Sequence, residues 1–176
     1  MRGEYGMILF VTGGSGSGKS EYAEARCAEL NTGRMLYVAT MEPSGREGKL
    51  RVKRHRRLRA GKGFETLECY THLEAADIPD HAVVLLECLS NLTANEMYSA
   101  NGRKDDVVGF VMKGVSHLAK KAEHLVIVTN NVFGDGISYD DSTVKYQRYL
   151  AQVNAQAAAI ADEVTEVVAG IPIRLR

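Results

Sequence analysis

The sequence predicts an α/β fold with a mainly parallel, helix-covered β-sheet, and two features of the chain support this. First, six short runs rich in Val, Ile or Leu occur at residues 7–11, 35–39, 82–86, 125–129, 164–168 and 171–175. They do not alternate with polar residues, which is typical of strands buried on both faces. Second, segments with helical character separate the first five runs, and such alternation usually gives a parallel sheet. We expect residues 1–176 to form a single domain.

The remaining elements follow from spacing and turn residues. Residues 20–30, 105–123 and 141–162 carry apolar side chains at helical intervals and are predicted helices. Only Ala169 and Gly170 separate the last two apolar runs, which is too short for a crossover, so these strands should be antiparallel neighbours. Pro172 favours an edge position for the last strand. Residues 101–104 and 133–141 are predicted exposed loops.

The first apolar run leads into a turn that matches the phosphate-binding P-loop pattern G-x-x-x-x-G-K-[ST]. Its members are Gly13, Gly14, Ser15, Gly16, Ser17, Gly18, Lys19 and Ser20. Glycines let backbone N–H groups converge on an anion, and the following helix presents its positive end to the phosphates. Lys19 would neutralise β- and γ-phosphate oxygens, and the Ser20 hydroxyl would hold Mg²⁺. A chance glycine-rich turn is the alternative, but the strand–turn–helix setting favours binding of a nucleoside triphosphate.

Further candidate ligands follow later strands, whose carboxyl ends should lie at the same edge of the sheet as the P-loop. Glu87 directly follows residues 82–86, an arrangement in which a carboxylate approaches Mg²⁺ directly or through water. The second run ends with Ala39, Thr40 and Met41, and residues 130–136 follow the fourth. The alternative is an ordinary strand end for residues 39–41 and, for Glu87, a polar residue that only marks the end of its strand. Glu68 is another candidate carboxylate with a poorer signal.

A strongly basic segment lies at residues 46–62, with nine Lys or Arg in seventeen residues and His55 among them. Three interpretations are open from the residues alone. The segment is a solvated helix face, a nucleic-acid-binding patch, or a polyphosphate site opposite the P-loop. In the third, cations around His55 would stabilise phosphoryl oxygens and favour the neutral, nucleophilic imidazole.

The amino-acid composition argues against several other classes of protein. The net charge is zero, which gives no general reason to expect nucleic-acid or membrane binding. No apolar run reaches the ~18 residues of a membrane-spanning helix. Cys27, Cys69 and Cys88 have no C-x-x-C spacing, so we expect reduced, partly buried thiols and a cytoplasmic location.

Several of these motifs together resemble the adenosylcobinamide kinase/adenosylcobinamide-phosphate guanylyltransferase family of cobalamin biosynthesis. The matching pieces occur in family order over almost the whole chain: VTGG (11–14), SGKS (17–20), YVAT (37–40), RVKRHR (51–56), TLEC (66–69), LLEC (85–88), VTN (128–130), Asn154, ADEV (161–164) and VAGIP (168–172). A P-loop alone is unspecific. The basic RVKRHR segment, LLEC and the two C-terminal pieces, ADEV and VAGIP, are much more specific in combination.

The resemblance implies a RecA-like P-loop fold, usually a homotrimer, and two activities. The family phosphorylates the aminopropanol hydroxyl of adenosylcobinamide, then transfers GMP from GTP through a guanylylated histidine to adenosylcobinamide phosphate, giving adenosylcobinamide-GDP. By position that histidine is His55, with Lys19 also catalytic. The implied GTP contacts are the eight P-loop residues, Ala39, Thr40, Met41, Arg56, Arg57, Leu58, Arg59, Glu68 and Glu87. Mg²⁺ would lie between Ser20 and Glu87, and ATP is an alternative phosphoryl donor.

The chain departs from the family pattern at three places. Gly16 stands where the P-loop usually has Arg, Asn130-Asn131-Val132-Phe133 replaces N-E-V-G, and Tyr146-Gln147-Arg148 replaces Phe-Arg-Asp. His55 and its neighbours are intact, which favours guanylyl transfer more directly than the kinase step. The alternatives are a P-loop small-molecule kinase with residues 46–62 as a lid, and a nucleotide-dependent nucleic-acid-binding protein that uses the same segment.

Overall fold

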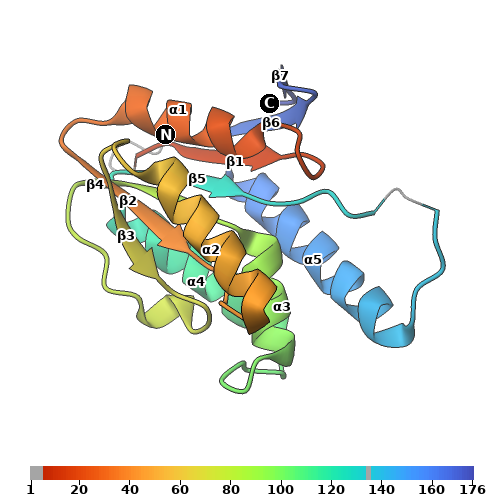
Figure 1. The fold of residues 1–176 in the computed structure, drawn as a ribbon. Helices are drawn as coiled ribbons and strands as arrows, with labels where there is room; N and C mark the ends of the chain where they lie inside the picture. The colour runs from red at the N-terminus through yellow and green to blue at the C-terminus, as the bar shows by residue number, and fades with distance from the viewer. Residues whose placement is uncertain (1–5, 134–135) are drawn as a thin grey trace.

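Seven strands form one sheet in the computed structural model, which describes residues 6–133 and 136–176 (Figure 1). The strands are β1 (Ile8–Thr12), β2 (Arg34–Ala39), β3 (Phe64–Glu68), β4 (Ala82–Glu87), β5 (His124–Val128), β6 (Glu163–Val168) and β7 (Ile171–Arg174). Their order is β3-β2-β4-β5-β1-β6-β7, parallel except for the β6–β7 pair. The predicted mainly parallel sheet and its antiparallel C-terminal edge are confirmed.

Strand β3 is the one strand of the described chain that the sequence analysis did not predict. Its sequence FETLE contains only two apolar residues, and it lies at the open edge of the sheet beside β2. Three of its five side chains are exposed. An edge strand needs no continuous apolar run, so the pattern that identified the other strands is missing here.

In the described part of the chain, five α-helices connect the strands: α1 (Lys19–Leu30), α2 (Gly45–Arg59), α3 (Leu89–Tyr98), α4 (Val107–Lys121) and α5 (Asp141–Ile160), with a short 3₁₀ helix at Leu73–Ala75. The three predicted helices are confirmed as α1, α4 and α5, with ends shifted by at most two residues. Asp140 fixes the start of α5, because its side chain accepts a hydrogen bond from Thr143 N at 3.1 Å. The predicted loop at 133–141 includes residues 134–135, which lie outside the described residues.

The core has two halves, one on each face of the sheet. Leu9 and Val11 of β1 pack with Ala23 and Cys27 of α1, whereas Phe10 packs on the opposite face with α3, α4 and α5. Figure 1 shows α1 and α2 on one face and α3, α4 and α5 on the other. This alternation follows from the two-residue period of a strand, and a helix layer on each face explains why the central strands are apolar throughout.

The sheet brings the carboxyl ends of the six parallel strands, β1 to β6, together at one edge. Strand β5 lies between β1 and β4, and Thr129 N donates to Val11 O at 3.0 Å just beyond the β1–β5 pairing. On the other side of β4, Thr40 N donates to Glu87 O at 3.0 Å. The P-loop, the end of β2 and the end of β4 therefore face one region of space. No helix among the described residues is long and apolar enough to cross a membrane.

Candidate active site at the P-loop

The P-loop backbone has a shape that only glycine allows at two positions. At Gly13, a Cβ atom would lie 2.5 Å from Ser17 Oγ and 2.6 Å from Val167 O, so no larger residue fits without displacing the backbone. Gly18 has φ +88°, a left-handed conformation that L side chains rarely adopt. The loop is thus held tightly between the end of β1 and the start of α1.

Lys19 and Ser20 open α1 and point back over this loop. The Lys19 side chain is buried, and its ammonium group donates to Gly14 O at 2.9 Å. Ser20 Oγ donates to Glu87 Oε1 at 2.5 Å, which brings the end of β4 against the start of α1. The ammonium group is held where it can neutralise an incoming phosphate oxygen.

The residues Ser20 and Glu87 fit the Mg²⁺ ion that the P-loop implies. Glu87 Oε2 is buried and has no hydrogen-bond partner among the described residues, so this carboxylate has an unused oxygen ligand beside the Ser20 hydroxyl. Within the described ranges, no group of three or more His, Cys, Asp or Glu side chains could hold a metal ion. Mg²⁺ usually keeps several water ligands and binds substrate phosphates, so the protein needs to supply only one or two oxygens, here from Ser20 and Glu87.

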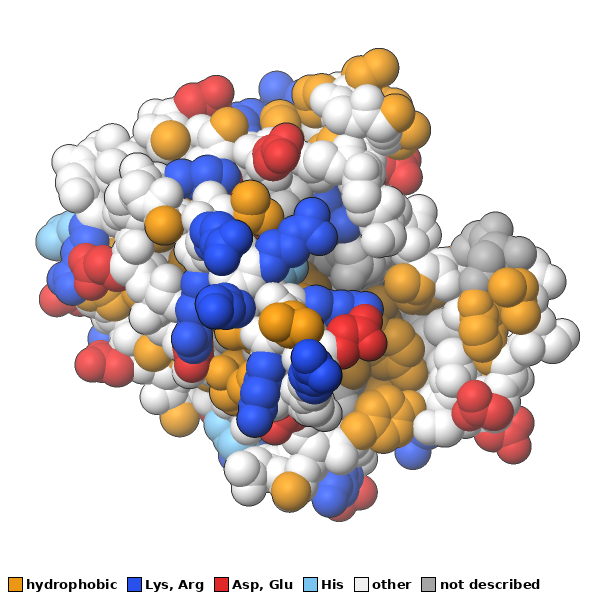
Figure 2. Space-filling view, viewed as in Figure 1, with side chains coloured by type: hydrophobic (Ala, Val, Ile, Leu, Met, Phe, Trp, Pro, Cys, Tyr) orange, Lys and Arg blue, Asp and Glu red, His pale blue; other side chains and the backbone are white. Residues whose placement is uncertain are grey.

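Helix α2 forms the wall opposite the P-loop, across a cavity of about 530 Å³. The helix contributes His55, three arginines and two apolar side chains: Arg51, Val52, Arg54, His55, Leu58 and Arg59. Positions 51, 55, 58 and 59 lie on one side of a helix because they are three or four residues apart. Figure 2 shows Lys and Arg side chains gathered on the face that carries this helix. The arrangement places an imidazole and several cations across from Lys19.

Two contacts attach the C-terminal half of α2 to the sheet. The Arg59 guanidinium lies 3.8 Å from the centre of the Tyr37 ring on β2, and Arg59 is itself buried. Arg56 forms an ion pair with Glu68 at the end of β3, and Tyr70 donates to the same carboxylate at 3.0 Å. Burial, together with the nearby Glu87 carboxylate, raises the pKa of the Tyr37 hydroxyl, so this ring remains neutral beneath the guanidinium.

The structure places most, but not all, of the predicted site residues in the wall of this cavity. Those in the wall are Ser15, Gly16, Lys19, Ser20, Ala39, Met41, His55, Leu58, Arg59, Glu68 and Glu87. Gly13, Gly14, Ser17 and Gly18 build the loop without lining the cavity, and Arg57 is exposed away from it. Thr40 is buried, and its Oγ1 donates to Cys88 O at 2.9 Å and accepts from Cys88 N at 2.6 Å. Thr40 therefore joins the ends of β2 and β4.

Sequence reasoning missed several side chains at the site. Tyr37 and Asn91 line the cavity, and Asn95 lies behind it, where its amide donates to Thr40 O at 2.7 Å and to Tyr70 O at 2.9 Å. Asn95 thereby links the segments that follow β2 and β3. The signal was the four-residue spacing of Asn91 and Asn95 directly after Glu87, which puts two amides on the same helix face.

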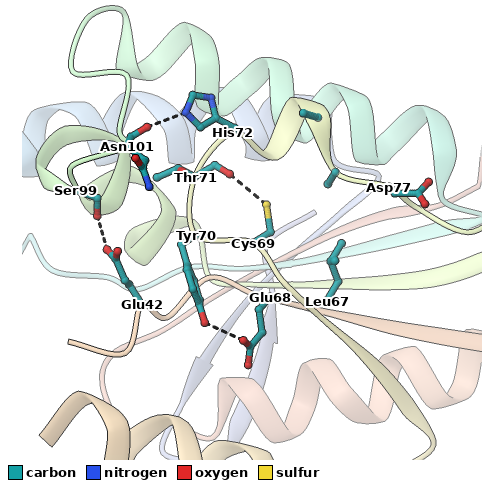
Figure 3. A pocket seen from close by; sticks show the side chains of 12 residues that line it. Glu42, Leu67, Glu68, Cys69, Tyr70, Thr71, His72, Asp77, Ser99 and Asn101 are labelled. Atoms are coloured by element: carbon teal, nitrogen blue, oxygen red, sulfur yellow. Dashed lines mark hydrogen bonds between the residues drawn. The ribbon is translucent and has the colours of Figure 1, made fainter. Parts of the chain in front are cut away.

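A smaller hollow of about 380 Å³ adjoins the cavity and shares Glu68 and Tyr70 with it. Figure 3 shows these two side chains pointing toward each other. The hollow is also lined by Glu42 and Asp77. Three carboxylates make it unsuitable for phosphate groups, so the phosphate-binding features are confined to the larger cavity.

Comparison with known proteins gives consistent results. Residues 9–175 match the family described as cobinamide kinase / cobinamide phosphate guanyltransferase. The chain is 31% identical over 184 residues to the bifunctional adenosylcobalamin biosynthesis protein CobU of Escherichia coli, covering 97% of this chain and 100% of that protein. It is also 31% identical over 188 residues to the protein of that name in Salmonella typhimurium, with the same coverage.

Solved structures are more distant. They include the flagellar accessory protein FlaH of Methanocaldococcus jannaschii, with TM-score 0.48, 14% identity and coverage of 98% of this chain and 79% of that one. Another, an ATPase domain, has TM-score 0.49 and 11% identity, covering 91% of this chain and 68% of that one. The family match spans nearly the whole sequence, and the chain belongs to the cobinamide kinase / cobinamide phosphate guanyltransferase family.

Proposed function

We propose that this protein phosphorylates adenosylcobinamide and then transfers GMP from GTP to adenosylcobinamide phosphate through a covalent intermediate on His55. One observation carries the proposal: His55 of α2 lines the same cavity as Lys19 and Ser20 of the P-loop and Glu87 of β4. A phosphate-binding loop and an imidazole on opposite walls are what attack on a nucleotide phosphorus requires. Family membership supports both activities.

In the guanylyl transfer, a neutral imidazole nitrogen of His55 attacks the α-phosphorus of GTP. The new P–N bond forms as the bond from the α-phosphorus to the bridging oxygen breaks, and pyrophosphate leaves with the electron pair. A phosphate oxygen of adenosylcobinamide phosphate then attacks the same phosphorus, the P–N bond breaks, and the imidazole is restored. Lys19, Arg51 and Arg54 stabilise the negative charge on the oxygens during both displacements, which is electrostatic and positioning work.

In the kinase step, the acceptor hydroxyl attacks the γ-phosphorus and the nucleoside diphosphate leaves. Ser20 and Glu87 would hold Mg²⁺, which supplies charge neutralisation at the phosphate oxygens. Lys19 binds oxygens of the γ-phosphoryl group that is transferred. Phosphoryl transfer passes through a loose transition state, so alignment of hydroxyl and phosphate contributes more than a strong base.

The test of guanylyl transfer is incubation of the protein with GTP labelled at the α-phosphorus. We expect a protein-bound label that is lost in acid and kept in alkali, as a phosphoramidate requires. His55→Asn should abolish it, whereas His81→Asn, the same change on an exposed residue before β4, should not. His81 has φ +55°, which Asn tolerates, so the control should fold normally. Equal labelling of the His55 variant, or no labelling of the native protein, would refute the covalent step.

We also propose Mg²⁺ as the metal, GTP with ATP as the alternative phosphoryl donor, a homotrimer, and a cytoplasmic location. The family resemblance supports the nucleotides and the trimer. The three cysteines are free, which supports a reducing compartment. Sedimentation of the purified protein tests the trimer, and γ-label transfer from ATP against GTP tests the donor.

A further inference from the structure

A second cavity, of about 560 Å³, opens on the other side of the P-loop. It lies among Gly14, Asn131 after β5, and the first turns of α5, with Tyr139, Thr143, Tyr146 and Gln147 in its wall. It shares no lining residue with the phosphate cavity. Its volume is typical of a small-molecule site. Figure 2 shows orange side chains beside the hollow that separates the body of the molecule from the lobe on the right.

The chemistry of this second cavity differs from that of the phosphate cavity. None of the described residues in its wall is charged: they are two amides, two tyrosines, a threonine, a valine and a glycine. Tyr146 donates to Ser90 O at 3.2 Å, and burial raises its pKa to about 12, so it stays neutral under ordinary conditions. Gln147 Nε2 donates to Val132 O at 3.2 Å and retains an acceptor oxygen and a second N–H. Such a wall suits an uncharged ligand that carries amide and hydroxyl groups.

Two of the sequence departures meet in this cavity. Asn131 stands where the family pattern has a carboxylate, and Gln147 stands where it has an arginine. Both positions carry uncharged amides in this chain, which keeps this part of the wall neutral.

The position of the cavity relates it to phosphoryl transfer. Gly14 lies in its wall, and Gly14 O accepts the hydrogen bond from Lys19 Nζ at 2.9 Å. Because the P-loop lysine reaches the β- and γ-phosphates, the terminal phosphate of a bound nucleotide is expected beside Gly14. A hydroxyl held in the second cavity would then face the γ-phosphorus from the side opposite His55 and α2.

We infer that the second cavity is the subsite for the alcohol acceptor of the kinase step, and that it holds the uncharged, hydroxyl-ended amide arm of adenosylcobinamide. This inference rests on the proposed function. The cavity holds the arm and leaves the corrin ring outside, since 560 Å³ corresponds to a drug-sized ligand. Gln147 and Asn131 pair with the amide of the arm, and Tyr146 packs against its carbon chain.

The experiment measures acceptor binding without catalysis. Adenosylcobinamide is dialysed to equilibrium against protein that carries His55→Asn, in the presence of Mg²⁺ and the β,γ-imido analogue of GTP, and the corrinoid is followed by its visible absorption. The imido bridge blocks phosphoryl transfer, and His55→Asn blocks attack on the α-phosphorus, which the imido analogue alone would still allow. Gln147→Leu keeps the side-chain size and removes the amide, and it should weaken acceptor binding about tenfold, the loss of one to two buried hydrogen bonds. Thr143→Trp should fill the cavity and abolish binding. Gln152→Leu, on an exposed position of α5, is the matched control and should bind normally.

The same variants separate this inference from the proposed function. Labelling of His55 by α-labelled GTP needs no acceptor, so Gln147→Leu should label at the native rate while its KM for adenosylcobinamide in γ-phosphoryl transfer rises. Native acceptor affinity in both cavity variants would overturn the inference and leave guanylyl transfer intact. The cavity variants are also tested for binding of a fluorescent GTP analogue. A loss of affinity for this analogue at an unchanged melting temperature would mean that the cavity holds the nucleoside. That result would overturn the inference, whether or not acceptor binding is also lost. Acceptor binding that depends on Gln147 in a protein that never labels His55 would support the inference and refute the covalent step.

Discussion

The two walls of the phosphate cavity differ in how firmly the fold holds them. On the P-loop side, Lys19 is buried and the five apolar residues that precede Glu87 in β4 are 0% exposed. On the opposite side, Arg59 is the only buried residue of α2, and Leu50 and Leu58 are 59% and 56% exposed. The phosphate-binding groups therefore belong to the core, whereas the candidate nucleophile belongs to a lightly attached helix.

This difference suits a covalent mechanism. The nucleotide must be held in one position, but the nucleophilic helix must first approach the α-phosphorus and then make room for an acceptor. Elements with few buried contacts open at low free-energy cost, whereas core strands open only with global unfolding. We expect α2 to exchange its amide hydrogens much faster than β1 or β4.

The largest expected effect is on stability, from the same substitution in both walls. Leu85→Ala removes a fully buried side chain from β4 and should lower the free energy of unfolding by about 2–5 kcal/mol. Leu58→Ala on α2 should change it by no more than about 0.5 kcal/mol, because the side chain is more than half exposed. Urea titration of both variants measures the difference. A similar loss in both would show that α2 is packed as part of the core.

The second effect is on catalysis, again with a pair of matched changes. Lys19→Ala removes the ammonium group held at the P-loop and should slow labelling of His55 by about 10²–10³-fold, as for other preorganised charge-stabilising groups. Lys53→Ala removes an exposed ammonium from α2 that does not line the cavity, and should label within about twofold of the native rate. Retained labelling in the Lys19 variant would remove the P-loop from the mechanism.

The same contrast explains how much the sequence could predict. The P-loop and Glu87 were identifiable because buried strands give unbroken apolar runs, and the residues at their ends stand out. Strand β3 has few apolar residues, so its pattern did not distinguish it from a loop. On α2 the many charged residues hide the helical pattern. Arg59 lines the cavity and Arg57 does not, and this difference depends on how the helix lies against the sheet, which the sequence does not indicate.

Contacts between distant segments were also beyond the sequence. Nothing local indicates that Arg59 lies over Tyr37, or that Asn95 joins the segments after β2 and β3. These contacts depend on strand order, since β2 lies between β3 and β4. The second cavity is a similar case: Asn131 and Gln147 were visible as separate departures, but only the fold places them in one wall.

The smallest effect concerns how α2 is attached. Arg59→Ala removes the guanidinium over Tyr37 and should weaken the attachment by about 1 kcal/mol, within the range of a partly buried cation–π contact. Hydrogen exchange in the C-terminal half of α2 should then accelerate about fivefold, with β4 unchanged. Arg57→Ala is the matched control, because Arg57 is exposed and lines no described cavity wall.

The two possible outcomes distinguish a hinge from a fixed wall. Faster exchange confined to α2 would show that Arg59 holds the helix against β2 while the P-loop side stays rigid. Equal exchange in the Arg59 and Arg57 variants would mean that the ion pair between Arg56 and Glu68 is sufficient to hold the helix. In that case α2 is attached to the sheet at β3. His55 would then move together with this edge strand, and α2 would not pivot about its C-terminal end.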